Sequence, residues 1–246
     1  MANPVIVTNK LTKKFGDFIA TNEISFEVNK GEIFGFLGAN GAGKTTAMRM
    51  LCGLSTPSSG SATIAGFDVY RQPEEIKKNI GYMSQKFSLY EDLTILENIN
   101  FFGGIYGLSN KQIKSKSDEL ITELGLQSEA KKLVASLPLG WKQKLSFSVA
   151  VIHQPAIVFL DEPTGGVDPV TRRQFWDLIY NASANGVTIF VTTHYMDEAE
   201  YCNRISIMVD GRIEALDTPA NLKKQFEATS MDEVFYRLAR NAKRAE

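Results

Sequence analysis

Residues 38–45 form a glycine-rich segment that limits what this chain can fold into. They read Gly-Ala-Asn-Gly-Ala-Gly-Lys-Thr and match the pattern G-x-x-x-x-G-K-[ST]. An apolar run, Ile33–Leu37, precedes them, and a helical pattern follows from Thr45 to Leu51. Strand, loop and helix in this order predict a backbone that wraps phosphate, because glycines permit close approach and a helix N-terminus favours an anion. The flanking elements disfavour a glycine-rich turn that matches by chance.

The loop predicts a nucleoside triphosphate with Mg²⁺ as ligand. Lys44 should reach the β- and γ-phosphates, and the Thr45 hydroxyl should ligate Mg²⁺. The residues expected to contact the nucleotide are Asn40, Gly41, Ala42, Gly43, Lys44, Thr45 and Thr46.

Two acids end another apolar run, residues 157–162, which reads Ile-Val-Phe-Leu-Asp-Glu. Ligands of open α/β sheets bind at the carboxyl ends of the strands. We therefore expect Asp161 to hold Mg²⁺ and Glu162 to orient and activate an attacking water. Acids in this position also often cap the next helix. The phosphate loop upstream favours the chemical interpretation.

Strand and helix patterns alternate along most of the chain. This alternation predicts an α/β fold with a largely parallel sheet covered on both faces. The expected strands are Val5–Thr8, Ile24–Val28, Ile33–Leu37, Ser61–Ala65, Ile157–Leu160, Val187–Val191, Ile205–Val209 and Ile213–Ala215.

One region breaks this alternation, because residues 89–147 show helical patterns only. We interpret it as a helical subdomain inserted into an α/β core made of residues 1–88 and 148–246. A longer set of crossover helices within one domain is the alternative.

Charge and hydropathy limit the classes of partner. The formal net charge is −1 over 246 residues, whereas a nucleic-acid-binding domain usually carries a basic patch or stripe. The N-terminus lacks the basic and apolar regions of a signal peptide, and no stretch reaches the roughly 18 apolar residues of a membrane helix. We expect no nucleic-acid partner, and any membrane role should require a separate subunit.

Further segments resemble the ATPases of ABC transporters, and the resemblance covers essentially the whole chain. Phe15, in Leu-Thr-Lys-Lys-Phe-Gly, matches the aromatic residue on which adenine stacks, although an ordinary strand-end residue would look the same. Gln85 matches the glutamine that senses Mg²⁺ and the γ-phosphate, and His194 matches the histidine that contacts this phosphate. Thr164-Gly-Gly-Val-Asp168 matches a loop that crosses the dimer interface.

The resemblance implies a RecA-like P-loop NTPase core with a small N-terminal antiparallel β region and an inserted helical subdomain. The catalytic residues that the motifs and the resemblance together imply are Lys44, Gln85, Glu162 and His194, and the implied metal ligands are Thr45, Gln85 and Asp161. Residues 89–99, Leu-Tyr-Glu-Asp-Leu-Thr-Ile-Leu-Glu-Asn-Ile, resemble drug-exporter ATPases more than importers of sugars or amino acids.

The family signature, Leu-Ser-Gly-Gly-Gln, is altered here. The matching residues are Leu137, Pro138, Leu139, Gly140 and Trp141. Pro138 supplies neither the hydroxyl nor the N–H of the usual serine, and Leu139 adds bulk where glycine permits approach to phosphate. With Asp168, residues 137–140 should line the dimer interface. Either a paralogue with an intact signature completes the site, or the altered segment works within a homodimer.

The sequence thus predicts an ATP-hydrolysing subunit that powers a membrane exporter of drugs, lipids or other hydrophobic compounds by ATP-driven dimerisation. Its expected partners are a separate integral membrane subunit and a second ATPase domain, identical or paralogous. The expected location is peripheral, at the cytoplasmic face of the cell (inner) membrane. The alternatives are a soluble ABC ATPase acting on nucleic acid or ribosomes and a non-catalytic ATP-binding regulator; Glu162 and His194 argue against the latter.

Overall fold

The computed structural model describes residues 3–85 and 89–240, whose strands form two sheets. An antiparallel sheet has the order β2-β1-β4-β5. A mixed sheet has the order β10-β9-β3-β8-β7-β6, in which only the pair of β10 and β9 is antiparallel among the described residues. The strands of the first sheet are β1 (Pro4–Phe15), β2 (Phe18–Asn29), β4 (Ser59–Ile64) and β5 (Phe67–Asp68). Those of the second are β3 (Ile33–Leu37), β6 (Ile80–Met83), β7 (Ile157–Asp161), β8 (Thr188–Thr193), β9 (Arg204–Val209) and β10 (Arg212–Asp217).

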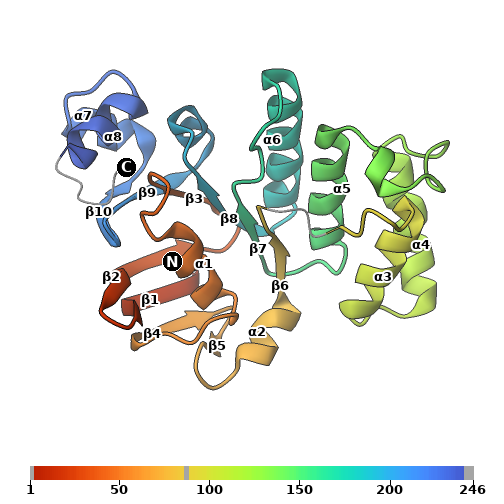
Figure 1. Ribbon diagram of the computed structural model, residues 1–246, viewed down its shortest axis with the longest axis horizontal. Helices are drawn as coiled ribbons and strands as arrows, with labels where there is room; N and C mark the ends of the chain where they lie inside the picture. The colour runs from red at the N-terminus through yellow and green to blue at the C-terminus, as the bar shows by residue number, and fades with distance from the viewer. Residues whose placement is uncertain (1–2, 86–88, 241–246) are drawn as a thin grey trace.

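Helices cover both faces of the mixed sheet, as its apolar strands require, since β3, β7 and β8 are buried along their whole length. Figure 1 shows α3 and α4 at one end of the molecule and α7 and α8 at the other. Across the described ranges, no helix is long and apolar enough to cross a membrane. The helices are α1 (Lys44–Leu51), α2 (Pro73–Asn79), α3 (Ile95–Ile105), α4 (Asn110–Glu123), α5 (Leu139–Val151), α6 (Pro169–Ala184), α7 (Pro219–Gln225) and α8 (Met231–Ala239), with 3₁₀ turns η1 (Val134–Ser136) and η2 (Met196–Tyr201).

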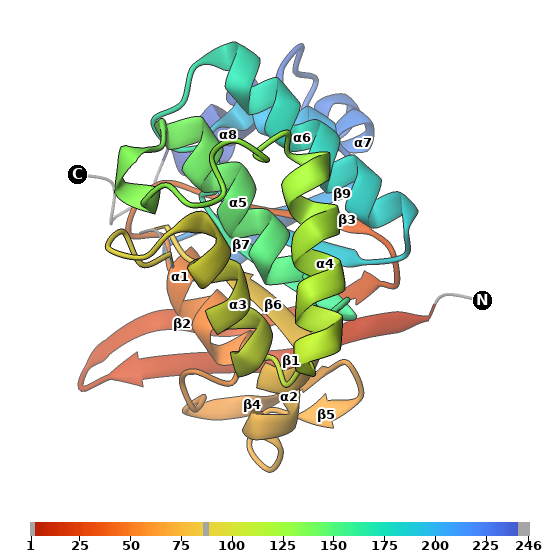
Figure 2. The ribbon, with the colours of Figure 1, turned by 90° about the vertical axis from the view of Figure 1, so that its right-hand side faces the viewer.

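Three apolar clusters hold these layers together. The first joins the two sheets through α1, with Phe26, Phe36 and Phe190 in mutual ring contact at centroid distances of 5.2–6.1 Å. The second lies on the other face of the mixed sheet and contains the buried Trp176 of α6. The third belongs to α3, α4 and α5, which lie side by side in Figure 2. Burial of large apolar side chains on this scale is the main stabilising contribution to the fold.

The predicted fold class, a RecA-like α/β core with an N-terminal antiparallel region, is confirmed, but several elements differ in detail. Strand β6 was not predicted, and β1 and β2 are each longer than expected. The residues that follow Met196 have a sequence pattern that predicts a helix, and the structure has the 3₁₀ turn η2 there. The expected subdomain boundary at 147 falls inside α5, and the boundary at 88 lies outside the described residues. The inserted helical subdomain itself stays a prediction.

Candidate active site

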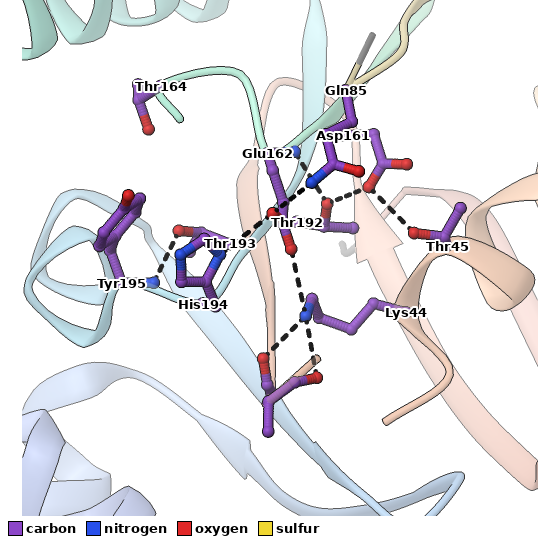
Figure 3. Close-up of polar contacts among 12 residues, drawn as sticks. Lys44, Thr45, Gln85, Asp161, Glu162, Thr164, Thr192, Thr193, His194 and Tyr195 are labelled. Atoms are coloured by element: carbon purple, nitrogen blue, oxygen red, sulfur yellow. Dashed lines mark hydrogen bonds and ion pairs between the residues drawn. The ribbon is translucent and has the colours of Figure 1, made fainter. Parts of the chain in front are cut away.

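The carboxyl ends of β3, β7 and β8 bring the main candidate residues together. These strands are parallel neighbours in the sheet, so the residues that follow them meet at one edge. Lys44 begins α1 after the loop that leaves β3, Glu162 follows β7, and His194 follows β8. Figure 3 shows their side chains pointing toward one another.

Lys44 is buried inside this edge, with 5% of its surface exposed. Its Nζ donates hydrogen bonds to the backbone oxygens of Gly38 at 2.8 Å and Ala39 at 3.1 Å. It also lies 3.4 Å from Oε1 of Glu162. Burial lowers the pKa of Lys44, an effect that the Glu162 carboxylate opposes. The ammonium group of Lys44 is thus held beside the phosphate loop by backbone oxygens, and phosphate oxygens could replace these as acceptors.

Glu162 is the centre of the polar contacts. Its Oε2 accepts a hydrogen bond from Nε2 of Gln85 at 3.0 Å and lies 3.1 Å from Nδ1 of His194. Its backbone has a φ of 50°, in the left-handed region that costs energy for a residue with a side chain. Its N–H donates to both the backbone oxygen and the hydroxyl of Thr192, each at 3.1 Å. These bonds tie the backbone of Glu162 to Thr192 near the end of β8.

Asp161 provides a second set of oxygen contacts, which shares the Thr192 hydroxyl with the backbone of Glu162. It is buried, and its Oδ1 accepts hydrogen bonds from the hydroxyls of Thr192 at 2.6 Å and Thr45 at 3.4 Å. A hydroxyl and a carboxylate side by side are oxygen donors of the kind that Mg²⁺ prefers. Thr45 and Asp161, two of the predicted metal ligands, therefore lie in contact. Gln85, the third predicted ligand, contacts Glu162, which follows Asp161 in the chain.

The phosphate loop has the backbone geometry that its glycines permit. Gly41 and Gly43 have φ values of 79° and 107°, which residues with side chains rarely adopt. A Cβ at Gly43 would lie 2.4 Å from the backbone oxygen of Ala20 in β2. Asn40, Gly41 and Thr45 are exposed, Gly43 and Thr46 are half-buried, and Ala42 and Lys44 are buried. One side of the loop is thus exposed, and its other side packs against β2 of the antiparallel sheet.

Phe15 lies apart from the strand ends, at the turn between β1 and β2. Its ring is 56% exposed, and Nζ of Lys13 lies 5.2 Å from the ring centroid. The β2 strand that leaves this turn reaches the phosphate loop through Ala20. An exposed aromatic ring at this turn fits the predicted role in stacking a base.

The altered signature segment lines a pocket at the start of α5 and α6. Pro138 occupies the N-cap position of α5 and provides no side-chain cap. Asp168 caps α6, accepting hydrogen bonds from the backbone of Val170 and from both the backbone and the hydroxyl of Thr171. The pocket lining includes Pro138, Leu139, Gly140, Val167, Asp168 and Thr171. Four of the five residues predicted for the dimer interface therefore meet.

Two residues of this segment have packing roles that the sequence did not indicate. Leu137 is buried in the apolar cluster of α3, α4 and α5. A Cβ at Gly140 would lie 2.3 Å from Cγ2 of Thr171, so close packing of α5 on α6 requires a glycine there. Leu139 lines the neighbouring pocket as well, together with Gln85, Glu162 and His194.

Sequence reasoning missed the residues that hold the site in place. Thr192 binds both acids, and Thr164 binds the buried Glu198, which lies near Arg172. The only sequence signal for Thr192 is its position at the end of a β-branched, apolar strand. Nothing in the local pattern marks Glu198 as the buried acid of its segment.

Comparisons with known proteins agree with this geometry. The family model for ABC transporters matches residues 21–165. The probable multidrug ABC transporter ATP-binding protein YbhF of Escherichia coli (strain K12) is 49% identical over 221 residues, which cover 90% of this chain and 38% of that protein. The linearmycin resistance ATP-binding protein LnrL of Bacillus subtilis (strain 168) is 34% identical over 219 residues, 89% of this chain and 70% of that protein.

A solved structure is similar over nearly its whole length. It is described as an ATP binding subunit of an ABC transporter, and the two folds agree with a TM-score of 0.86 at 27% identity, over 96% of this chain and 99% of that chain. The chain therefore spans less than half of YbhF but most of LnrL and of this subunit. Because the family model covers more than half of the chain and LnrL matches along most of its length, this chain belongs to the ABC transporter family, among its ATP-binding proteins.

Proposed function

We propose that this chain binds and hydrolyses MgATP within a pair of ATPase domains, and that hydrolysis powers an exporter through a separate integral membrane subunit. The observation that carries this proposal is the convergence of three side chains on one carboxylate. Lys44, Gln85 and His194 each place a nitrogen 3.0–3.4 Å from an oxygen of Glu162. Phosphoryl transfer to water depends on positioning and on charge neutralisation, and this cluster supplies both.

The residues present fit both cofactors. The loop backbone from Asn40 to Thr46 and the ammonium group of Lys44 would hold the phosphates, and Phe15 would stack on the base. Thr45 and Asp161, which already share a hydrogen bond of 3.4 Å, would hold Mg²⁺ with Gln85 nearby. When bound, Mg²⁺ would neutralise negative charge on the phosphate oxygens.

The chain's own residues divide the remaining work. Glu162 accepts hydrogen bonds, so its carboxylate orients a water and takes up its proton. His194 and Gln85 contact the same oxygen of Glu162, and they keep that carboxylate in one rotamer. Lys44 exchanges the backbone oxygens of Gly38 and Ala39 for phosphate oxygens, which makes its charge available to the transferred group.

The second half of the site is proposed to come from another ATPase domain. Pro138, Leu139, Gly140 and Asp168 line one pocket whose lining does not include Lys44, and this pocket would face the partner's nucleotide. The partner is either a second copy or a paralogue with an intact signature. ATP bound between the two domains would hold them closed, and hydrolysis would release them.

Export is supported by the relatives and by one exposed surface. YbhF is described as a multidrug ABC transporter protein and LnrL as a linearmycin resistance protein. Tyr90 and Phe101 are 47% and 41% exposed, and their rings form an edge contact at 4.9 Å. Because Tyr90 follows Gln85 closely in the chain, this surface suits a membrane subunit that senses the nucleotide. The chain would then be peripheral, at the cytoplasmic face of the membrane.

Purification of the tagged chain from solubilised membranes tests this proposal. We expect a polytopic membrane protein to co-purify, and we expect the complex to release phosphate from ATP only while Mg²⁺ is present. Chelation of Mg²⁺ is the matched control for the release. Co-purification with ribosomes or nucleic acid, without a membrane protein, would contradict export and favour the soluble alternative.

A further inference from the structure

The loop that carries Glu162 needs support on both sides. Glu162 has a left-handed backbone, and such a conformation persists only where its surroundings fix it. Thr192 fixes the N-terminal side through two hydrogen bonds to the N–H of Glu162. On the C-terminal side the chain runs through Pro163 to Thr164, whose side chain is buried.

Thr164 is tied to the segment that follows His194. Its hydroxyl donates a hydrogen bond of 2.5 Å to Oε1 of Glu198, and Glu198 is fully buried in the 3₁₀ turn η2. This bond joins the loop after β7 to the turn after β8. The two segments also carry Glu162 and His194, whose side chains lie 3.1 Å apart.

Arg172 connects the same segments from α6. Its Nε lies 3.6 Å from Oε1 of Glu198, and its guanidinium carbon lies 4.4 Å from the ring centroid of Tyr195. The ring of Tyr195 in turn lies 4.2 Å from that of His194. Arg172 therefore contacts both Glu198 and the residue next to His194, which limits how the turn after β8 can tilt.

Stability alone does not account for a carboxylate in this position. Within the described part of the chain, Oε2 of Glu198 is buried without a hydrogen-bond partner. A buried carboxylate with incomplete hydrogen bonding costs stability relative to an apolar side chain of similar size. The burial of this carboxylate is better explained by the residues that it holds in position, Thr164 and Arg172.

We propose that Glu198 is a positioning residue for ATP hydrolysis, which acts through Thr164 and Arg172 to set the place of Glu162 relative to His194. The inference rests on the proposed function, because it assigns a role within that reaction. Small displacements of a reacting group have large effects on rate, of the order of 100-fold for about 1 Å. Loss of the Thr164 hydroxyl should therefore lower turnover more than it lowers ATP binding.

The test uses the purified complex and compares phosphate release with the number of ATP molecules bound. Thr164→Val removes the hydroxyl at nearly constant volume and should lower kcat per bound ATP about tenfold, with KM unchanged. Thr164→Ser keeps the hydroxyl and should restore most of the rate. Asp197→Asn is the matched control, because Asp197 pairs with Arg172 from the surface, with a 64% exposed side chain, and its rate should equal that of the wild type.

A second variant guards against a folding defect. Glu198→Gln keeps an acceptor for Thr164 but loses the charge opposite Arg172, and kcat per bound ATP should fall while ATP binding persists. Wild-type kcat in both Thr164→Val and Glu198→Gln, or a loss of turnover that only follows a loss of ATP-binding sites, would overturn the positioning role. Glu162→Gln in the same experiment separates the two proposals: if it also keeps wild-type turnover, the proposed role of Glu162 in activating water fails, whereas a wild-type complex that releases no phosphate from MgATP contradicts the proposed function itself.

Discussion

The altered signature can be tested by the double change Pro138→Ser with Leu139→Gly. Pro138 occupies the N-cap of α5 without a side-chain hydrogen bond, and Leu139 is 37% exposed in the pocket beside Asp168. The double change adds a hydroxyl at the start of the helix and removes the bulk in front of it. In the proposed pair of domains, both changes face the partner's nucleotide.

The magnitude follows from the hydrogen bond that is gained. A hydroxyl that donates to a charged group is worth about 1.5–3 kcal/mol, which is about 10- to 150-fold in rate if the bond acts fully in the transition state. The effect on folding should be small, because a serine N-cap adds about 1 kcal/mol and a glycine in place of leucine costs about as much. Gly140 keeps its contact with Thr171, so the packing of α5 on α6 should not change.

The assay is steady-state phosphate release by the chain alone at saturating MgATP. We expect slow release by the wild type and a rise of about tenfold or more in the double variant. Pro138→Ala with Leu139→Gly is the control, since it removes the same bulk without adding a hydroxyl, and it should stay slow. A brisk wild-type rate that the double change fails to raise would refute the reasoning, and would make Leu-Pro-Leu-Gly-Trp a competent signature in a working homodimer.

Three further predictions concern other parts of the molecule. Lys44→Ala removes the buried ammonium group and should abolish tight binding in a titration with labelled ATP; unchanged affinity would rule out its role. A cysteine in place of Tyr90 should cross-link to the membrane subunit, whereas one in place of Tyr236, 70% exposed on α8 at the far end of the molecule, should not. Burial lowers the pKa of His153 to about 4, so the unfolded chain takes up a proton first as the pH falls below about 6.5. With solvent screening taken into account, acidification from about pH 7 to about pH 5 should lower the free energy of unfolding of the wild type by roughly 1 kcal/mol more than that of His153→Phe. Urea unfolding at the two pH values measures both losses, and equal losses would contradict this prediction.

The parts of the site that sequence could predict are those set by local pattern. The phosphate loop is defined by consecutive residues, and the acids of β7 are defined by their place at the end of an apolar strand. The rule that parallel strands present their carboxyl ends at one edge then predicts the meeting of Lys44, Asp161 and Glu162. The contacts of Lys44 with Glu162 and of Thr45 with Asp161 agree with this rule.

Elements defined by tertiary contacts could not be predicted in the same way. Strand β6 is short and contains Gly81, where a Cβ would lie 2.1 Å from the backbone oxygen of Ala150. Gly81 weakens the strand pattern of β6. The contact that requires a glycine there is made with α5, which lies far away in the sequence. In β1 the half-buried Lys13 and the exposed Lys14 hide the strand's length, and several register shifts against β2 break the alternation of buried and exposed residues.

The sequence also could not predict which side chains support the site from within the core. Asp197 and Glu198 are neighbours in η2, yet the side chain of the first is 64% exposed and the second is fully buried. A 3₁₀ turn offers no periodic pattern long enough to indicate which acid points inward. Arg172 pairs with both acids, and the tertiary contact that distinguishes Glu198 is its hydrogen bond from the buried Thr164.

Hydrolysis of ATP at Glu162 is tested most directly by Glu162→Gln in the purified complex. The change removes the carboxylate charge but keeps the shape of the side chain and its left-handed backbone. Bound ATP and released phosphate are measured in one experiment, with the wild type as reference. We predict that the variant binds as much ATP as the wild type and releases no phosphate; phosphate release at the wild-type rate would contradict the assignment of Glu162 as the residue that activates water.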